Sequence, residues 1–298
     1  MTSLELPSAP ACAPPDFSPR QPQIKLPPFS CDTHAHILGP IAQFAFDAAR
    51  VYTPPDCLLI DYQKMLATLG IDRAVLVQPS VYGTDNTVLL HALAQAGRSF
   101  RGVAVVDNTI SAIELAQLHE AGIRGVRVNI VDVKDRKPGT LPLPELKALA
   151  NRIAPHGWHM EFLMHCDEFA DLDQSFADFP VPIVLGHLGY MKTSQGLHNP
   201  GFKALLRLMQ TGQAWVKLTG PYRISSEALP HRDTQKYAEA LLKANPKRVI
   251  WGSDWPHVMV KNDMPNDGDL CDLLQDWIPD PTVLEQVLVK NPSALYGF

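Results

Sequence analysis

The sequence predicts a closed (β/α)8 TIM barrel, an α/β fold built as a single domain, from three observations. Short runs rich in Val, Ile and Leu recur at fairly even spacing, with helix-like stretches between them. The runs are nearly continuous in apolar residues, which is typical of parallel strands covered on both faces. Eight of them fit in the 298 residues, and one barrel of this kind takes roughly 250 residues.

The eight expected strands each end in a polar residue or lead directly into one. In chain order they are residues 29–36, 74–80, 102–107, 125–129, 158–165, 182–187, 214–219 and 249–254. Catalytic groups of such barrels lie at the C-terminal ends of the strands, so these ends supply the candidates for a site. The candidates are His34, His36, Asp107, Arg127, His165, His187, Lys217 and Asp254.

The stretches between the strands have helical periodicity. Residues 61–69 and 87–96 place Leu and Ala at three-to-four spacing, and residues 113–122 end in a glycine that can cap a helix. These helices are expected to form the outer ring of the barrel. The alternative is an open doubly wound sheet, which often carries a glycine-rich phosphate loop after its first strand. No such loop is present, which favours the closed barrel.

Composition indicates an ordinary globular enzyme with a small-molecule partner. Hydrophobic residues make up 46% of the chain, enough for one large core. The net charge of −5 and pI near 6.1 give no basic field for nucleic acid or anionic lipid. Five scattered cysteines without a C-x-x-C pair indicate a reducing cytoplasm. Cys166 is a candidate nucleophile, although a buried free thiol is more often a small hydrophobe.

Residues 1–28 hold eight prolines and contain neither a cationic start nor an apolar core, so neither a secretory signal nor a membrane span is predicted. They are expected to form an extended arm, either disordered or lying across a neighbouring subunit. The barrel then occupies residues 29–298, with no second domain. The expected assembly is a monomer or a small homo-oligomer.

The first and last strands carry complementary polar groups. Alternation along the first strand sends His34 and His36 to the same face, close enough to share a metal ion or a substrate oxygen. Barrel closure places Asp254 beside them. A carboxylate next to two imidazoles suits either a metal ligand or a general base that takes a proton from water. A structural histidine pair and a simple ion pair are the alternatives.

Together with motifs along most of the chain, these residues resemble the amidohydrolase superfamily, in the branch containing 2-pyrone-4,6-dicarboxylate lactonase and related sugar lactonases. The motifs lie at residues 32–36, 77–86, 102–107, 122–129, 157–159, 181–189 and 251–257. The resemblance implies a (β/α)8 fold and hydrolysis of a lactone ring. Asp254 would activate water, while His34, His36 and His187 would polarise the carbonyl group.

Such an arrangement suits the reaction, because lactone opening builds negative charge on the carbonyl oxygen and fixed positive groups or donors stabilise that charge. Guanidinium groups match carboxylates in geometry and charge, which favours a carboxylated lactone as the substrate. For each cation, including Lys217, the alternative is a structural ion pair. The residues expected to bind the substrate are Tyr52, Ser80, Arg127, His165, Arg223 and His257.

The chain departs from the pyrone lactonase pattern where further anion-binding residues are expected. Val133, Leu163 and Met259 stand at those places, and only Lys134 or Arg136 from the same loop offer replacements. The reaction class is therefore better predicted than the substrate, and the 130–140 loop is where specificity is expected to reside.

The resemblance leaves the cofactor open, because the pyrone lactonase is metal-independent whereas other superfamily members hold one or two divalent ions. Arg127 and Asn129 on the fourth strand disfavour a two-metal centre, so no obligatory metal is expected. One divalent ion such as zinc on His34, His36 and Asp254 is the alternative. A metal-dependent decarboxylase or hydratase acting on a carboxylated aromatic-catabolism intermediate is the alternative activity, and a non-catalytic binding protein is the third hypothesis.

Overall fold

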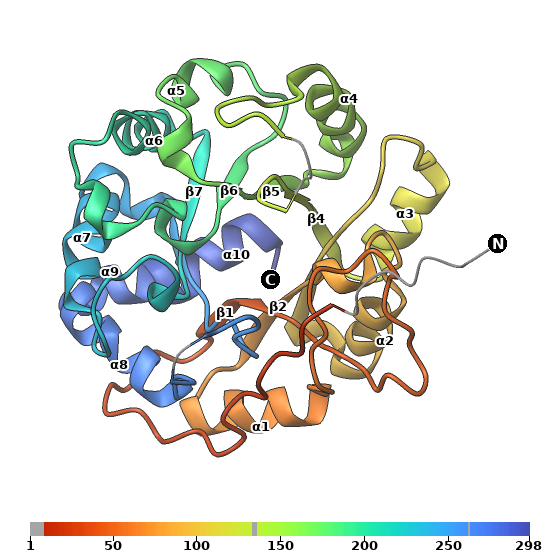
Figure 1. Cartoon of the computed structure of the whole chain (residues 1–298), viewed down its shortest axis with the longest axis horizontal. Helices are drawn as coiled ribbons and strands as arrows, with labels where there is room; N and C mark the ends of the chain where they lie inside the picture. Colours follow the sequence, from red (N-terminus) through yellow and green to blue (C-terminus); the bar gives the residue numbers. More distant parts are fainter. Residues whose placement is uncertain (1–8, 133–135, 262) are drawn as a thin grey trace.

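Eight parallel strands form a barrel ringed by helices in the computed structural model (Figure 1). The structure describes residues 9–132, 136–261 and 263–298. Neighbouring strands pair in sequence order, and the first and last meet through a parallel bridge between Ala35 and Trp255. The His36 N–H donates to the Trp255 carbonyl at 2.8 Å across the same seam. The predicted (β/α)8 fold is confirmed.

Each predicted strand is present, but most are shorter than their apolar runs. The strands are β1 Cys31–Ala35, β2 Arg73–Val77, β3 Phe100–Ala104, β4 Ile123–Asn129, β5 His159–Leu163, β6 Ile183–Leu185, β7 Ala214–Leu218 and β8 Val249–Trp251. Several predicted site residues therefore lie in the loops just beyond the strands. Asp254 follows β8 by three residues and His165 follows β5 by two, so loop conformation sets their direction.

Helices follow the strands and ring the barrel, except α10, which lies at its centre in this view (Figure 1). They are α1 Leu59–Leu69, α2 Thr87–Ala96, α3 Ala112–Glu120, α4 Leu143–Ile153, α5 Leu172–Ser175, α6 Pro200–Gln210, α7 Gln235–Ala244, α8 Asp267–Trp277, α9 Pro281–Glu285 and α10 Asn291–Tyr296. Tyr296 of α10 packs with the strand residues Cys31, Val75 and Val103 in one buried cluster inside the barrel. Among the described residues, no helix is long and apolar enough to cross a bilayer.

The extended segment 9–28 lies against the barrel of its own chain, an arrangement that was not among the two expected from the sequence. The Cys12 N–H donates to the Thr53 carbonyl at 2.9 Å, and Arg20 forms an ion pair with Asp269 at the start of α8. The segment is held because its backbone and charged groups find partners on the barrel surface. The first eight residues lie outside the described part of the chain.

A buried carboxylate joins the two strands at the seam. Asp32 accepts hydrogen bonds from the His34 N–H at 3.0 Å, the Ser253 N–H at 2.9 Å, the Ser253 hydroxyl at 2.5 Å and the Tyr62 hydroxyl at 2.9 Å. Burial raises the pKa of Asp32 to about 6, although these donors oppose the shift. With both oxygens used by the protein, Asp32 fixes β1 against the segment that carries Asp254.

Candidate active site

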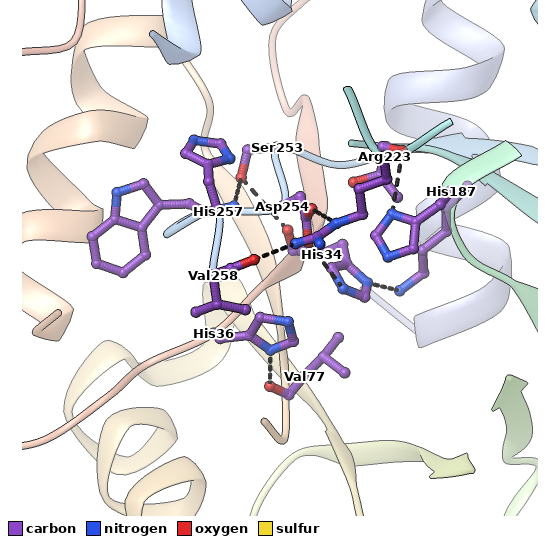
Figure 2. A network of polar contacts seen from close by, with 12 residues as sticks. His34, His36, Val77, His187, Arg223, Ser253, Asp254, His257 and Val258 are labelled. Carbon is purple, nitrogen blue, oxygen red and sulfur yellow. Dashed lines mark hydrogen bonds and ion pairs between the residues drawn. The ribbon is translucent and has the colours of Figure 1, made fainter. Parts of the chain in front are cut away.

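The four residues predicted to be catalytic lie together at the C-terminal end of the barrel (Figure 2). His34, His187 and Asp254 are buried, and each offers a ligand atom within 4.8 Å of those of the other two. The His34 ring centroid lies 5.0 Å from that of His36 and 5.6 Å from that of His187. Side chains from the first, sixth and last strand segments thus surround one small space.

Asp254 is oriented by partners on one of its two oxygens. Oδ2 accepts from the Arg223 Nε–H and from the Tyr222 hydroxyl, both at 2.6 Å, while Oδ1 lies 3.7 Å from His34 Nε2. Burial alone raises the pKa of Asp254, but the charge of the Arg223 guanidinium opposes it, and that pKa lies well below its usual range. Asp254 is therefore a carboxylate whose Oδ1 faces the histidines.

A fully buried lysine controls the state of His34. The Lys217 ammonium lies 2.7 Å from the Thr33 carbonyl, 2.7 Å from Glu161 Oε2 and 3.1 Å from His34 Nδ1. Burial lowers the pKa of Lys217, whereas the Glu161 carboxylate opposes that shift and favours the ammonium. Its three hydrogens match these three acceptors, so Lys217 is a structural ion pair and is not exposed to a substrate.

The same contacts assign the hydrogen on the His34 ring. Glu161 Oε1 also lies 3.1 Å from His34 Nδ1, but a hydrogen on Nδ1 would point at the ammonium and leave one of its N–H groups without an acceptor. We therefore place the ring hydrogen on Nε2, which is buried without a hydrogen-bond partner among the described residues. Burial and then the Lys217 charge hold the pKa of His34 well below its usual range, so the ring is neutral and offers a donor to the site.

The other two imidazoles have the opposite polarity. His36 Nδ1 lies 2.7 Å from the Val77 carbonyl, and His187 Nδ1 lies 3.3 Å from the Thr219 carbonyl. A carbonyl only accepts, so both rings carry their hydrogen on Nδ1 and leave Nε2 as an acceptor. Burial lowers the pKa of His36 to about 3 and that of His187 to about 4. Neither ring is an imidazolium near neutral pH.

Three of the predicted substrate-binding residues come from the side of the barrel formed by β2 to β4. Ser80 and Arg127 line a cavity of about 430 Å³ that extends from the ends of these strands to α4. The Arg127 Nη1–H donates to the Gln78 carbonyl at 2.9 Å. Tyr52 is buried and hydrogen-bonded to Ser80, and burial raises its pKa to about 12. A guanidinium and two hydroxyl groups are thus grouped at this side.

Two further residues predicted to bind the substrate are His165, which stacks on Tyr190, and His257, which is buried inside the protein. His165 stacks on Tyr190 with ring centroids 4.5 Å apart, and its Nδ1 lies 2.7 Å from the Tyr190 carbonyl, which leaves its Nε2 free. His257 is fully buried, with Nδ1 2.9 Å from the Tyr222 hydroxyl and Nε2 3.2 Å from Asp267 Oδ1. Both nitrogens of His257 are used inside the protein, so the structure does not present it to a substrate.

Of the two replacement cations expected in the loop after β4, Arg136 is bound by a carboxylate of the protein itself. Arg136 makes a paired contact with the Glu168 carboxylate, at 2.7 and 3.1 Å. This ion pair uses the guanidinium face that would bind a substrate anion. Val133 and Lys134 lie outside the described residues.

The alternative nucleophile is excluded by its surroundings. Cys166 is fully buried, and burial raises the pKa of its thiol well away from the range of reactive thiolates.

Sequence patterns alone do not single out several residues that contact the site, because their roles depend on partners distant in sequence. Tyr222 adjoins the predicted Arg223, which is the one available signal. These residues are Glu161, Tyr190, Tyr222 and Asp267.

The spacing of His34, His187 and Asp254 would admit a metal ion, but their hydrogen bonding does not fit one. The predicted ligand His36 is not part of this close group. His34 Nε2 carries a hydrogen in place of a free lone pair, and the Arg223 guanidinium already neutralises Asp254. Only two donors remain, fewer than the three protein ligands usual at a catalytic zinc site.

Comparison with known proteins identifies the family. The Amidohydrolase family model matches residues 31–298. A 2-pyrone-4,6-dicarboxylate hydrolase of Comamonas testosteroni is 36% identical over 94% of this chain and 93% of its own. The chain belongs to the amidohydrolase family.

Other amidohydrolase relatives cover nearly the whole chain. A 4-sulfomuconolactone hydrolase of Rhizobium radiobacter is 35% identical over 91% of both chains. A probable 2-pyrone-4,6-dicarboxylic acid hydrolase of Acinetobacter baumannii, solved with citric acid bound, superposes with a TM-score of 0.80 at 26% identity, over 91% of this chain and 100% of its own. The family predicted from the sequence motifs is confirmed.

Proposed function

We propose that this amidohydrolase opens the ring of an anionic lactone by adding water to its carbonyl group. The observation that carries this proposal is the pairing of an ionised carboxylate, Asp254, with two neutral imidazoles of opposite polarity in one buried space. His34 offers a donor there, whereas His187 offers an acceptor. A water molecule needs acceptors for its hydrogens, and a carbonyl oxygen needs a donor, so the set matches both reactants.

In the proposed reaction, Asp254 Oδ1 and His187 Nε2 accept the two hydrogens of the attacking water. The water oxygen bonds to the carbonyl carbon, one water proton passes to Asp254, and the carbonyl electron pair moves onto oxygen. The His34 Nε2–H stabilises that oxygen as its charge develops. When the tetrahedral intermediate collapses, the ring C–O bond breaks and the departing oxygen takes the proton back from Asp254. The product is the open-chain hydroxy acid or its keto tautomer.

The anionic character of the substrate is supported by the cations around the site. Arg127 projects into the neighbouring cavity with Ser80, and the half-buried Arg223 lies beside the base. The named relatives act on a dicarboxylate or on a sulfomuconolactone, and one was solved with citric acid. We infer a carboxylated lactone, such as 2-pyrone-4,6-dicarboxylate or a close relative, held by Arg127, Tyr52, Ser80, His165 and Arg223.

Metal independence is part of the proposal, because the residues present do not fit a divalent ion. A zinc ion would require His34 to move its hydrogen to Nδ1, against the Lys217 ammonium. In place of the positive charge of a metal ion, the N–H groups of His34 and of the nearby arginines would stabilise the carbonyl oxygen.

The test is hydrolysis of a lactone panel with and without a strong chelator. The panel contains 2-pyrone-4,6-dicarboxylate, 4-sulfomuconolactone, a sugar-acid lactone and an uncharged six-membered lactone. We expect anionic lactones to be opened after chelation at an unchanged rate. Asp254→Asn should lower turnover by about a hundredfold or more, the scale of losing a general base, while Asp263→Asn on the exposed loop nearby serves as the matched control.

Two outcomes would contradict the proposal. Turnover that disappears on chelation and returns with zinc would make the histidines and Asp254 metal ligands. Silence across the panel, with carbon dioxide released from a carboxylated aromatic compound, would support a decarboxylase of the same superfamily.

A further inference from the structure

Behind Asp254 lies a chain of three hydrogen-bonded side chains, of which Tyr222 is partly buried and His257 and Asp267 are buried. The Tyr222 hydroxyl lies 2.6 Å from Asp254 Oδ2 and 2.9 Å from His257 Nδ1. His257 Nε2 in turn lies 3.2 Å from Asp267 Oδ1. The chain joins the turn after β7, the loop after β8 and the first residue of α8.

The direction of these hydrogen bonds follows from the ionised state of Asp254. A carboxylate only accepts, so Tyr222 must donate its hydroxyl hydrogen to Oδ2. The Tyr222 oxygen must then accept from the His257 Nδ1–H. One proton therefore lies between His257 Nε2 and Asp267, whether His257 is an imidazolium or Asp267 is a carboxylic acid. In both cases, His257 donates its hydrogen bond to Tyr222, and Tyr222 donates its own to Asp254.

His257 holds Asp254 in a second way. Its backbone N–H donates to the Asp254 carbonyl at 2.8 Å, and both residues have left-handed backbones, with φ of 70° at Asp254 and 59° at His257. Such angles are uncommon outside glycine and persist only where surrounding contacts impose them. His257 thus fixes both the main chain of the carboxylate and, through Tyr222, its side chain (Figure 2 shows His257 beside Asp254).

We propose that Tyr222, His257 and Asp267 are positioning residues that hold Oδ2 of the base, so that Oδ1 alone faces the water. The proposal rests on the proposed role of Asp254 as the base. It also accounts for the buried His257, whose sequence position beyond the last strand suggested a substrate contact.

The test compares Tyr222→Phe with Tyr237→Phe, which removes another buried tyrosine hydroxyl, one that donates to the Thr193 carbonyl at 2.8 Å away from the site. We expect Tyr222→Phe to lower kcat by about tenfold to a hundredfold, the scale of one hydrogen bond to a charged group, with KM within about twofold. Tyr237→Phe should leave kcat unchanged. In an Asp254→Asn background, Tyr222→Phe should cause little further loss.

The far end of the chain is tested by two substitutions of Asp267. Leucine cannot bridge to His257 and should lower kcat about as much as Tyr222→Phe does. Asparagine can donate its amide hydrogen to His257 Nε2 and keep the direction of the chain, so Asp267→Asn should retain about tenfold more turnover than Asp267→Leu. Equal losses in the two variants, or a rise in KM without a fall in kcat, would overturn the proposal.

A substrate-free measurement separates this proposal from the lactonase reaction. In protein labelled with 15N-histidine, the His257 Nδ1–H should give a slowly exchanging proton resonance that disappears in Tyr222→Phe. Absence of that resonance from the unsubstituted protein would refute the chain even if lactones are hydrolysed. Its presence without hydrolysis of any lactone would leave the chain in place and refute the proposed reaction.

Discussion

The imidazoles of this site are neutral, which determines how its chemistry should respond to pH. Burial lowers the pKa of His36 to about 3 and that of His187 to about 4, whereas Asp254 stays ionised beside the Arg223 guanidinium. An uncharged ring cannot stabilise an oxyanion by its charge, so only its hydrogen-bond polarity matters. The lowered pKa values do not support an imidazolium at either position.

We therefore expect kcat/KM for a lactone with fully ionised carboxylates to stay level between about pH 7 and pH 8, above the pKa of about 6 of the structural Asp32. The pKa values of His34, His36, His187 and Asp254 are all lowered to below this interval, so these four groups do not change charge within it. The measurement is a pH–rate profile at constant ionic strength, corrected for spontaneous hydrolysis. A rate that falls tenfold per unit as pH rises through 6.5 would indicate a required imidazolium.

Sequence reasoning brought the candidate residues together but did not identify their hydrogen-bond partners. Strand alternation and barrel closure were sufficient to place His34, His36 and Asp254 together, because both follow from backbone geometry. The inward ion pair of Lys217 and the fully bonded ring of His257 depend on Glu161, Tyr222 and Asp267. Those contacts join distant parts of the chain, and no periodicity encodes them.

Among the elements, the seam between β1 and β8 leaves no room for a side chain at Gly252. A Cβ atom built on Gly252 would lie 2.7 Å from the His34 backbone nitrogen and 2.7 Å from its Cβ. The last strand segment therefore approaches the first through a position that only glycine fits. Both strands were predicted from the sequence. Their last residues were not, because each strand ends where its backbone turns away from the adjacent strand.

Gly252→Ala should separate the two strands and displace the side chains that they carry. We expect the free energy of unfolding to fall by about 1–3 kcal/mol, the usual cost of overpacking, and turnover to fall by about tenfold or more through loss of alignment. Urea unfolding and steady-state kinetics measure both effects. Gly186→Ala is the control, since a Cβ there meets no atom within 4 Å, and equal behaviour of the two variants would refute the packing argument.

At the scale of the whole molecule, the extended segment 9–28 supports the barrel near its active end. The Asn266 side chain donates to Asp16 and accepts from the Arg20 N–H at 2.9 Å. The Arg20 carbonyl packs so closely on Gly268 that no Cβ would fit there. These contacts surround the start of α8, where Asp267 lies. Composition predicted an extended segment but could not identify the surface that it covers.

Removal of residues 1–28 should lower the free energy of unfolding by about 2 kcal/mol or more, given several lost hydrogen bonds of about 1 kcal/mol each. Turnover should fall as well, because the start of α8 loses its support. Denaturant unfolding and kinetics of the shortened chain provide the measurement. Arg20→Ala removes only a surface ion pair, whose contribution is small, so a loss as large as that of the deletion would mean that charge, not backbone packing, attaches the segment.

The meeting of β1 with the segment after β8 has a consequence for synthesis of the protein. His34 leaves the ribosome more than two hundred residues before Asp254 does, an interval of roughly 10 to 40 seconds at the usual rates of translation. During that time the growing chain contains a donor without its base. Incomplete chains therefore cannot carry out the proposed hydrolysis. Activity would begin only when β1 pairs with the segment that follows β8.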